Sequence, residues 1–394
     1  MQLADRMAPL ASAIFAELNQ KKRDLLAAGR RVYDFSIGSP DLGPAVHIRE
    51  ALANAALNPN NYHYAVKDEA SLLKAAAAWY ARRFGVTLDP KSEVISLLGS
   101  QDGLGHLSLA LINPGETVLV PDPCYPVFSE GPLLAQARVV RMPLRPENNY
   151  LIDFAAIPSA DAKAAKLMIV SYPNNPTTAM APPEFYQDLV AFAKGYGIYV
   201  LHDNAYSELT FDGRTTGSFL QYPGAKEIGL EFNSLSKTYS MAGARVGFAL
   251  GNPDLVGALA SLKSHLDYGM FLPIQRAAEA ALNGPQDIVS TTRTTYERRR
   301  DLLVEGLAAL GWQVPKPAAT MFVWAPVPDR FASSTEFALE LSEKSGVIVV
   351  PGAAFGSYGE GYVRLALVQP EDVISQALEA LRSCQLFFGR FIRD

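Results

Sequence analysis

The stretch Glu231–Gly251, EFNSLSKTYSMAGARVGFALG, decides how the rest of this chain is interpreted. Its first residues are typical of a buried strand, and the run that follows places Lys237 among small hydroxyl side chains. Arg245 comes eight positions after the lysine. A useful interpretation of the whole sequence has to explain why these two cations lie close to the end of a predicted strand.

The size and composition of the chain bound the class of protein. Its 394 residues suggest two domains, or one large domain with a satellite. Apolar residues make up 49% and charged residues 19%, which allows a sizeable core. The formal net charge of -5 gives no electrostatic footprint for nucleic acid or an anionic membrane. We therefore expect neither of these as a partner.

The cysteines and the N-terminal residues indicate a cytoplasmic protein. Only Cys124 and Cys384 occur, so we expect free thiols and no disulfide framework. Asp5, Arg6 and Glu17 interrupt the apolar N-terminal stretch, which fails the pattern of a signal peptide. No run of 18 apolar residues is present, so we expect no transmembrane helix.

Short apolar runs alternate with helical patterns between about residues 70 and 285. The runs that read as strands are 92–100, 116–123, 165–176, 197–206, 227–237 and 245–252. Segments between them, such as 103–112 and 183–196, have helical periodicity. This alternation predicts an α/β fold, with a mostly parallel sheet covered by helices on both faces.

The character of the sequence changes near Gln286. A long helical pattern begins there, followed by short strands and helices typical of a smaller α+β domain. An N-terminal helix over 15–28 and a loop over 37–45 precede the large domain. The predicted division is an N-terminal segment (1–48) that packs with the small domain, a large domain (49–285) and a small C-terminal domain (286–394).

Polar side chains follow the predicted strands at the points where each strand ends. If the sheet is mostly parallel, these side chains converge on one crevice at its carboxyl edge. In chain order they are Ser100, Gln101, Tyr125, Asn175, Asp203, Tyr206, Ser234, Ser236, Lys237 and Arg245.

One end of this set suits a phosphate. Ser100 and Gln101 begin a predicted helix, whose free N–H groups bind anions. The stretch is neither a GxGxxG fingerprint nor a P-loop, because the glycine spacing is wrong and GK[ST] is missing. Ser234, Ser236 and Arg245 would add further donors.

The other end suits an aromatic ring that carries an aldehyde. Asp203 could keep a ring nitrogen protonated, and Asn175 and Tyr206 could hydrogen-bond a ring oxygen. Tyr125 could stack on the ring, and Lys237 could form a Schiff base with the aldehyde. These features together describe pyridoxal 5'-phosphate (PLP) as the predicted cofactor.

Six motifs strengthen this prediction because they occur together and in order. They are GSQDGL (99–104), PDPCYPVF (121–128), YPNNPT (172–177), HDNAYSEL (202–209), SLSKTYSMAGARVGF (234–248) and YVRLAL (362–367). With them the chain resembles the fold-type I, class I and II aminotransferases of the aspartate aminotransferase superfamily. It is most similar to the group that contains LL-diaminopimelate and alanine aminotransferases.

The resemblance implies a seven-stranded sheet in the PLP-binding domain and a role for each motif residue. Lys237 would be the Schiff-base lysine and the base that moves the substrate proton. Arg364 would bind the substrate α-carboxylate with its fork of donors, and Gly38 would lie in the loop that covers the substrate. Tyr64 resembles the tyrosine that reaches the phosphate from the other subunit, which implies a homodimer with shared active sites.

The implied reaction is a ping-pong transamination between an L-amino acid and a 2-oxo acid, with 2-oxoglutarate and glutamate as one pair. Two positions depart from the family pattern. Glu69 occupies a common glycine position, which concerns the shape of the loop after Tyr64. Ala13 stands where diaminopimelate enzymes often have tyrosine, which concerns the substrate. The expected substrate is LL-diaminopimelate or alanine, and the alternative candidates are methionine and the aromatic amino acids.

Other interpretations stay open at this point. A PLP-dependent C–S β-lyase would use the same lysine, aspartate and arginine, and a PLP-sensing regulator would need an added DNA-binding domain. Individual residues also have plainer explanations: Asn175 can fix a turn, Tyr125 can pack in a core, and Tyr64 can belong to a core or an interface. The five histidines show no metal-ligand spacing, and His202 should point away from Asp203 because neighbours in a strand face opposite sides.

Overall fold

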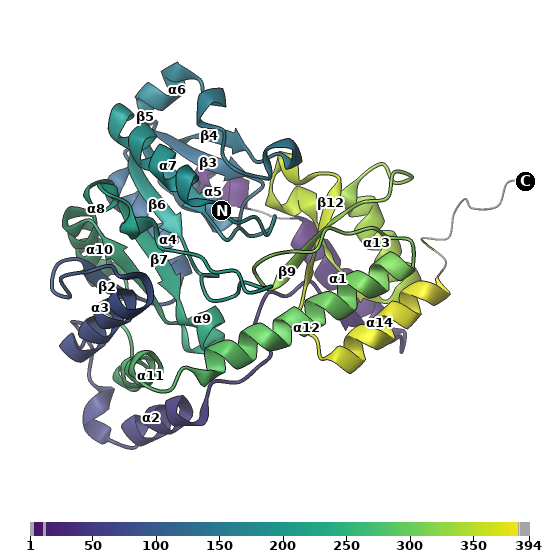
Figure 1. Cartoon of the computed structure of the whole chain (residues 1–394), viewed down its shortest axis with the longest axis horizontal. Coiled ribbons are helices and arrows are strands. Elements are labelled where there is room, and N and C mark those ends of the chain that lie inside the picture. The colour runs from purple at the N-terminus through teal and green to yellow at the C-terminus, as the bar shows by residue number, and fades with distance from the viewer. Residues whose placement is uncertain (1–3, 11–12, 385, 387–394) are drawn as a thin grey trace, which may run out of the picture.

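The computed structural model describes residues 4–10, 13–384 and 386. Its larger part is built on a seven-stranded sheet with the order β2-β8-β7-β6-β5-β3-β4 (Figure 1). The strands of this sheet are β2 (Val94–Leu97), β3 (Thr117–Asp122), β4 (Arg138–Pro143), β5 (Ala165–Ser171), β6 (Tyr199–Asp203), β7 (Gly229–Ser234) and β8 (Gly247–Gly251).

The sheet is mostly parallel, as predicted. Strands β4, β3, β5, β6 and β7 run parallel to one another, whereas β8 is antiparallel to both β7 and β2. The six predicted strands are present, and the sequence analysis missed β4. This strand lies at the edge of the sheet and exposes Arg138 and Arg141, so it lacks the continuous apolar run that marks the buried strands.

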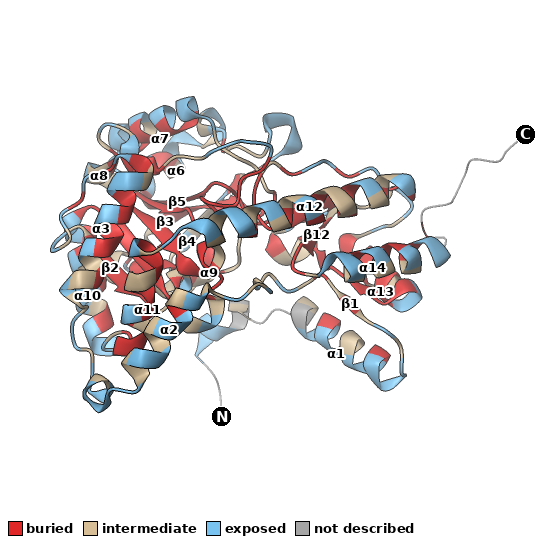
Figure 2. Ribbon diagram, turned by 60° about the horizontal axis from the view of Figure 1, so that its bottom comes forward, coloured by how far each residue is buried: buried red, intermediate tan, exposed pale blue. Residues whose placement is uncertain are grey.

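Two apolar cores flank the sheet because alternate residues of each strand face opposite sides. In β5, Met168 and Val170 belong to one core, and Leu167 and Ile169 belong to the other. Figure 2 shows the buried strands between helices whose outer faces are exposed. The helices around the sheet are α2 (Val46–Ala56), α3 (Ala70–Phe84), α4 (Ser100–Leu111), α5 (Val127–Leu134), α6 (Ser159–Ala164), α7 (Pro183–Tyr196), α8 (Ala225–Ile228), α9 (Leu235–Thr238), α10 (Pro253–Leu266) and α11 (Leu272–Asn283).

A second, smaller body joins the two ends of the chain around its own core. The three-stranded antiparallel sheet β11-β12-β9 lies there, and β1 from the N-terminal segment pairs in parallel with β10. Its strands and helices are α1 (Ala13–Ala27), β1 (Tyr33–Asp34), α12 (Asp287–Ala309), β9 (Phe322–Pro326), α13 (Ser334–Ser345), β10 (Val347–Ile348), β11 (Val350–Pro351), β12 (Tyr362–Ala366) and α14 (Glu371–Ser383).

Short 3-10 helices complete the connections. They are η1 (Asp5–Leu10), η2 (Pro59–Tyr62), η3 (Pro146–Asn148), η4 (Phe154–Ala156), η5 (Phe219–Gln221), η6 (Ala242–Ala244), η7 (Gly352–Phe355) and η8 (Ser357–Gly359). Within the described residues, no helix combines the length and apolar character needed to cross a membrane. The domain limits at 48/49 and 285/286 stay a prediction, and the side chain of Ala13 lies outside what the structure describes.

Candidate active site

A cavity of about 410 Å³ opens at the carboxyl ends of the parallel strands. It gathers every predicted site residue except Tyr64, from both bodies of the molecule. The predicted residues that line it are Gly38, Ser100, Gln101, Tyr125, Asn175, Asp203, Tyr206, Ser234, Ser236, Lys237, Arg245 and Arg364. Tertiary structure thus brings together residues that are as far apart in sequence as Gly38 and Arg364.

One end of the cavity is rich in donors for an anion. The N-terminus of α4 begins at Ser100, directly after Gly99, whose φ of +79° suits glycine. The Arg245 guanidinium packs over Gly99, so closely that a Cβ added there would lie 2.8 Å from Cζ. Arg245 Nη1 donates to the carbonyl of Ala242 at 3.1 Å. Within the described part of the chain, Arg245 forms no ion pair with a carboxylate, which leaves its charge available to a ligand.

Asp203 places a buried carboxylate at the end of β6. Its Oδ1 atom is buried and has no hydrogen-bond partner among the described residues. Burial raises the pKa of Asp203 to about 6, although the neighbouring His202 opposes the shift. An unpartnered buried carboxylate oxygen is costly, so this atom is suited to accept a hydrogen bond from a ligand in the cavity.

His202 faces away from the cavity, as predicted from the alternation along β6. Its Nδ1 atom lies 2.9 Å from Glu231 Oε2, and both side chains are fully buried. Glu231 also accepts hydrogen bonds from the Tyr80 hydroxyl and from the Phe219 N–H. His202 and Asp203 therefore do not form a catalytic dyad.

Lys237 lies in the short helix α9, which Ser234 caps by accepting a hydrogen bond from the Ser236 N–H. Its Nζ atom donates to the carbonyl of Gly38 at 2.6 Å. Burial, together with the positive charges of Arg364 and Arg245, lowers the pKa of Lys237 to about 8, against the opposing effect of Asp203. The side chain is thus a better nucleophile near neutral pH than an exposed lysine.

Arg364 lies on β12 between two aromatic rings. Its Cζ atom is 4.2 Å from the centroid of Phe322 and 4.7 Å from that of Phe355. Nη1 donates to Asn175 Oδ1 at 2.9 Å, and Nη2 donates to the Ser36 carbonyl at 3.0 Å. Burial lowers its pKa to about 10, so the group stays charged at neutral pH. Arg364 lines the cavity.

The aromatic residues of the cavity also have defined contacts. The Tyr125 hydroxyl donates to Gln101 Oε1 at 3.1 Å. Burial raises the pKa of Tyr206 far above its usual value, so its phenol stays protonated. The peptide bond between Asn175 and Pro176 is cis.

The sequence analysis missed Phe322, which lines the cavity beside Arg364 and Tyr206. This residue occurs in an apolar strand whose other members are core residues, so no sequence signal distinguished it. Ser39, Leu104, Ala205, Ala242 and Gly243 also line the cavity and were not predicted. Most are next to predicted residues, and proximity in sequence was the available clue.

Tyr64 lies outside the cavity. Its side chain is 78% exposed, and its ring lies 5.3 Å from that of Tyr268. Glu69, nearby, begins α3 and pairs with Arg276 at 2.9 Å. The predicted role of Tyr64 in a neighbouring subunit therefore stays a prediction.

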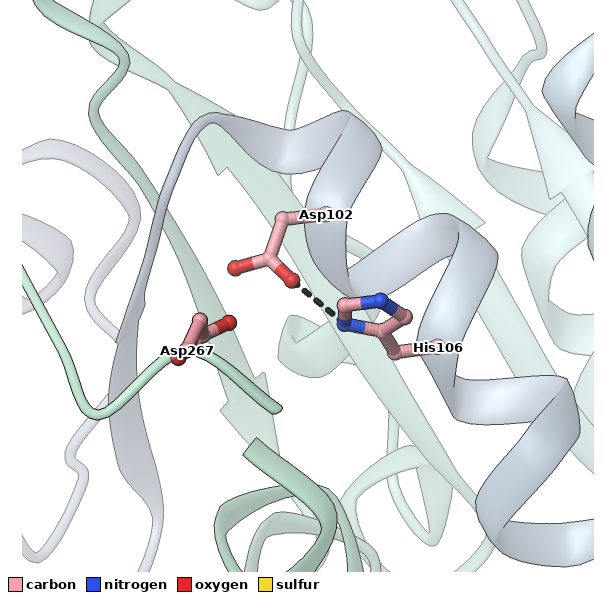
Figure 3. A group of neighbouring side chains, drawn as sticks. All are labelled: Asp102, His106 and Asp267. Carbon is pink, nitrogen blue, oxygen red and sulfur yellow. Dashed lines mark ion pairs between the residues drawn. The ribbon is translucent and has the colours of Figure 1, made fainter. Parts of the chain in front are cut away.

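A second polar cluster is formed by two residues near the start of α4 and one residue that follows α10 (Figure 3). Asp102 Oδ1 and His106 Nδ1 are 2.6 Å apart, and Asp267 faces them from the segment after α10. The spacing could hold a metal ion, but the Lys263 ammonium already donates to both Asp102 and Asp267. Because this cation neutralises the carboxylates, the cluster is explained as an ion-pair network.

The donor set of the cavity fits PLP. The orphaned Oδ1 of Asp203 suits a protonated ring nitrogen, the Gly99 turn under Arg245 suits a phosphate, and Lys237 is a buried amine of lowered pKa. Nothing in this set of side chains conflicts with that cofactor.

The fold and the site together define a PLP-dependent transaminase, and comparison with known proteins agrees. Residues 30–381 match the family described as aminotransferase class I and II, and the chain belongs to this family. It is a PLP-dependent aminotransferase that acts on small-molecule amino acids and 2-oxo acids.

The chain is also similar to individual proteins over nearly its full length. The chain is 46% identical over 383 residues to the LL-diaminopimelate aminotransferase of Moorella thermoacetica, covering 97% of this chain and 98% of that protein. It is 47% identical over 382 residues to the protein of the same name from Desulforudis audaxviator, with 97% of each covered. Among solved structures, apo-BacF from Bacillus subtilis has a TM-score of 0.95 and 38% identity, covering 99% of this chain and 100% of that one.

Proposed function

We propose that this enzyme transfers the amino group of LL-diaminopimelate to a 2-oxo acid, with 2-oxoglutarate and glutamate as the other pair. The observation that carries the proposal is the likeness, at 46–47% identity over nearly the full length, to proteins named for that substrate. In each turnover the donor gives up its amino group and becomes a 2-oxo acid, and the acceptor becomes an amino acid.

The cofactor would be held by residues at both ends of the cavity. Ser100, Gln101, Ser234, Ser236 and Arg245 would bind its phosphate through charge-assisted hydrogen bonds. Asp203 and Asn175, with Tyr206 and Tyr125, would bind its ring. When bound, PLP supplies an aldehyde that takes up the amino group and a ring that accepts an electron pair.

Lys237 would carry the proton during the reaction. Its Nζ atom is buried among cationic groups, and its pKa near 8 places it between amine and ammonium at physiological pH. A general base works best when its pKa is near the operating pH. The ionised Asp203 would stay close by and keep the ring nitrogen protonated.

Arg364 would orient the substrate by its α-carboxylate. The guanidinium offers parallel donors that match a carboxylate, and it packs over the rings of Phe322 and Phe355. Its Nε atom is buried and has no partner among the described residues, so a donor stays available. Gly38 would let the covering loop approach the substrate.

We also propose a homodimer in which Tyr64 acts in the site of the neighbouring subunit. Tyr62, Tyr64, Val66, Tyr268 and Phe271 are all exposed on one part of the large body. On this surface the rings of Tyr62 and Phe271 pack against each other, and so do those of Tyr64 and Tyr268. Exposed aromatic groups of this kind are typical of interfaces.

The experiment is a titration of the PLP-loaded protein with single amino acids and no acceptor. The panel is LL-diaminopimelate, L-glutamate, L-alanine, L-methionine and L-phenylalanine, and the absorption band of the bound cofactor is measured. We expect LL-diaminopimelate and L-glutamate to remove the band and a 2-oxo acid to restore it.

Two other outcomes would contradict either the proposed substrate or the proposed reaction. A response to alanine, methionine or phenylalanine with none to LL-diaminopimelate would contradict the proposed substrate. Pyruvate and ammonia formed without an acceptor from L-cystathionine, which carries sulfur on Cβ, would indicate a C–S β-lyase.

A further inference from the structure

The loop over residues 36–41 is anchored at its far end by a two-pronged ion pair. Arg299 Nη1 lies 2.7 Å from Asp41 Oδ1, and Nη2 lies 2.8 Å from Oδ2. The Tyr296 hydroxyl also approaches Asp41 Oδ1, at 3.4 Å. A planar guanidinium bound to both oxygens of a carboxylate fixes orientation as well as distance, so Asp41 has a defined place relative to α12.

Arg299 is well placed to act as a fixed point. Its side chain is only 6% exposed, and α12 runs from the large sheet to the second body (Figure 1). Arg299 Nη1 also donates to the carbonyl of Leu367 at 3.2 Å. Leu367 directly follows β12, the strand that carries Arg364. One guanidinium thus binds both the loop and the end of this strand.

The loop over residues 36–41 also lines the cavity, through Gly38 and Ser39, and contacts two of the proposed site residues. The Ser36 carbonyl accepts from Arg364 Nη2, and the Gly38 carbonyl accepts from Lys237 Nζ. A Cβ added at Gly38 would lie 2.8 Å from the ring of Phe322, so the loop packs closely against this ring. Any displacement of Asp41 would therefore move Gly38 and Ser36 relative to Arg364.

We propose that Arg299, acting through Asp41 and the Leu367 carbonyl, is a positioning residue for the substrate α-carboxylate. Arg299 does not line the cavity. It holds the loop and the Arg364 strand at a fixed separation, so that the carboxylate meets a preformed site. The inference rests on the proposed binding role of Arg364 but not on which amino acid is the donor.

The test compares two variants of the pair with a neighbouring control. Asp41→Asn keeps the shape of the side chain and removes its charge, and Arg299→Lys keeps the charge but loses the fork. Arg298→Gln is the control, because Arg298 is the adjacent residue on α12 and pairs with Glu371 at the surface, 3.1 Å away. An exposed pair of this kind contributes little to stability.

Three measurements are made on each variant. The first is PLP bound per chain and its absorption maximum. The second is KM and kcat for whichever amino acid the unaltered enzyme converts. The third is the Kd of glutarate, by calorimetry; glutarate has carboxylates but neither an amino nor an oxo group, so it reports on carboxylate binding alone.

We expect KM and the glutarate Kd to rise on the order of tenfold in Asp41→Asn and Arg299→Lys, which is about 1.4 kcal/mol of binding. The kcat should change much less, because both variants loosen the carboxylate site and leave Lys237 and the PLP-binding residues unaltered. Bound PLP and its absorption maximum should stay unchanged, and Arg298→Gln should resemble the unaltered enzyme. An unchanged KM and Kd in both variants, an equal rise in the control, or loss of PLP together with substrate affinity would overturn the proposal. Failure of both variants to fold, with a folded control, would also overturn it, because the pair would then be purely structural.

If the unaltered enzyme converts none of the five amino acids, the proposed function fails, and the glutarate measurement still decides the role of Arg299.

Discussion

Lys237 and Asp203 depart from the ordinary acid–base behaviour of their side chains for the same reason, which is burial. Burial disfavours the charged form, so it lowers the pKa of the lysine and raises that of the aspartate. The two shifts bring both groups toward neutral pH. A pair of groups adjusted in this way is typical of a site for proton transfer.

Labelling of the PLP-free protein should reveal the lowered pKa of Lys237. Only the neutral amine reacts with limiting acetic anhydride, so its modification should rise with pH to a midpoint near 8, far below the ordinary 10.5. Peptide mass spectrometry measures the midpoint for each lysine.

Arg364→Met is the matched variant for this measurement. It removes a positive charge that lowers the lysine pKa, so the midpoint should move upward. A midpoint near 10.5 in the unaltered protein would show that Lys237 is solvated and not buried.

Asp203→Asn should stabilise the PLP-free protein although it impairs cofactor binding. The folded protein raises the Asp203 pKa from 3.8 to about 6, so its favourable contribution is complete below about pH 3.8 and is lost as pH rises through 6. At pH 7 to 8 the buried carboxylate therefore costs stability, on the order of 1–3 kcal/mol.

Chemical denaturation of both proteins at pH 8 and pH 4 measures this difference. The gain in the free energy of unfolding should be present at pH 8 and small at pH 4. A variant that is equally or less stable at pH 8 would contradict the inferred cost of the charge.

At the scale of the element, the start of α4 is shaped by Gly99 and Arg245. The positive φ of Gly99 and the guanidinium above it leave no room for a side chain. Gly105 lies on the same helix with its nearest neighbour, Val127 Cγ2, 3.9 Å from an added Cβ. The two glycines therefore have different reasons to be present.

Gly99→Ala should weaken PLP binding on the order of tenfold or more, because the added methyl group would displace the Arg245 guanidinium, which is proposed to bind the phosphate. Gly105→Ala should leave PLP binding unchanged and stabilise α4 by about 0.5–1 kcal/mol. Cofactor titration and thermal unfolding measure the two effects. Equal PLP affinity in the two variants would contradict the place assigned to the phosphate.

At the scale of the whole molecule, the location of Tyr64 leads to a test by complementation. Lys237→Ala and Tyr64→Ala are each expected to lose most activity. In a mixed dimer, the Lys237→Ala subunit would supply an intact Tyr64 to the site of its neighbour. Unfolding and refolding an equal mixture should therefore restore about one quarter of the activity by random pairing in a twofold dimer.

The control uses Tyr196→Ala, an exposed tyrosine on α7, which should be active by itself. No recovery in the Lys237→Ala and Tyr64→Ala mixture, with dimers demonstrated by sedimentation, would show that Tyr64 does not act across the interface.

How far the sequence predicted the site differs from residue to residue. Asp203 ends β6 and Lys237 lies three residues after β7, so the geometry of a parallel sheet predicts that they meet. Arg245 precedes the antiparallel β8, whose first residue, Gly247, pairs with Ser234 at the end of β7. Arg364 and Gly38 were assigned only through the resemblance to a family, because no local pattern relates a loop near the N-terminus to a strand near the C-terminus. Phe322 and Arg299 escaped prediction, since an aromatic residue in a strand and an arginine on a helix both have ordinary explanations.

The sequence by itself determined six of the seven strands of the large sheet, since their apolar runs reflect local burial. It determined the cofactor too, because the residues that suit PLP follow consecutive strands. Only the tertiary structure decided the antiparallel course of β8, the edge strand β4, the aromatic faces around Arg364 and the anchor from Arg299 to Asp41. These features depend on contacts between residues far apart in the chain, such as the 258 positions between Asp41 and Arg299. Local periodicity carries no record of such contacts, because each partner is compatible with many others until the chain has packed.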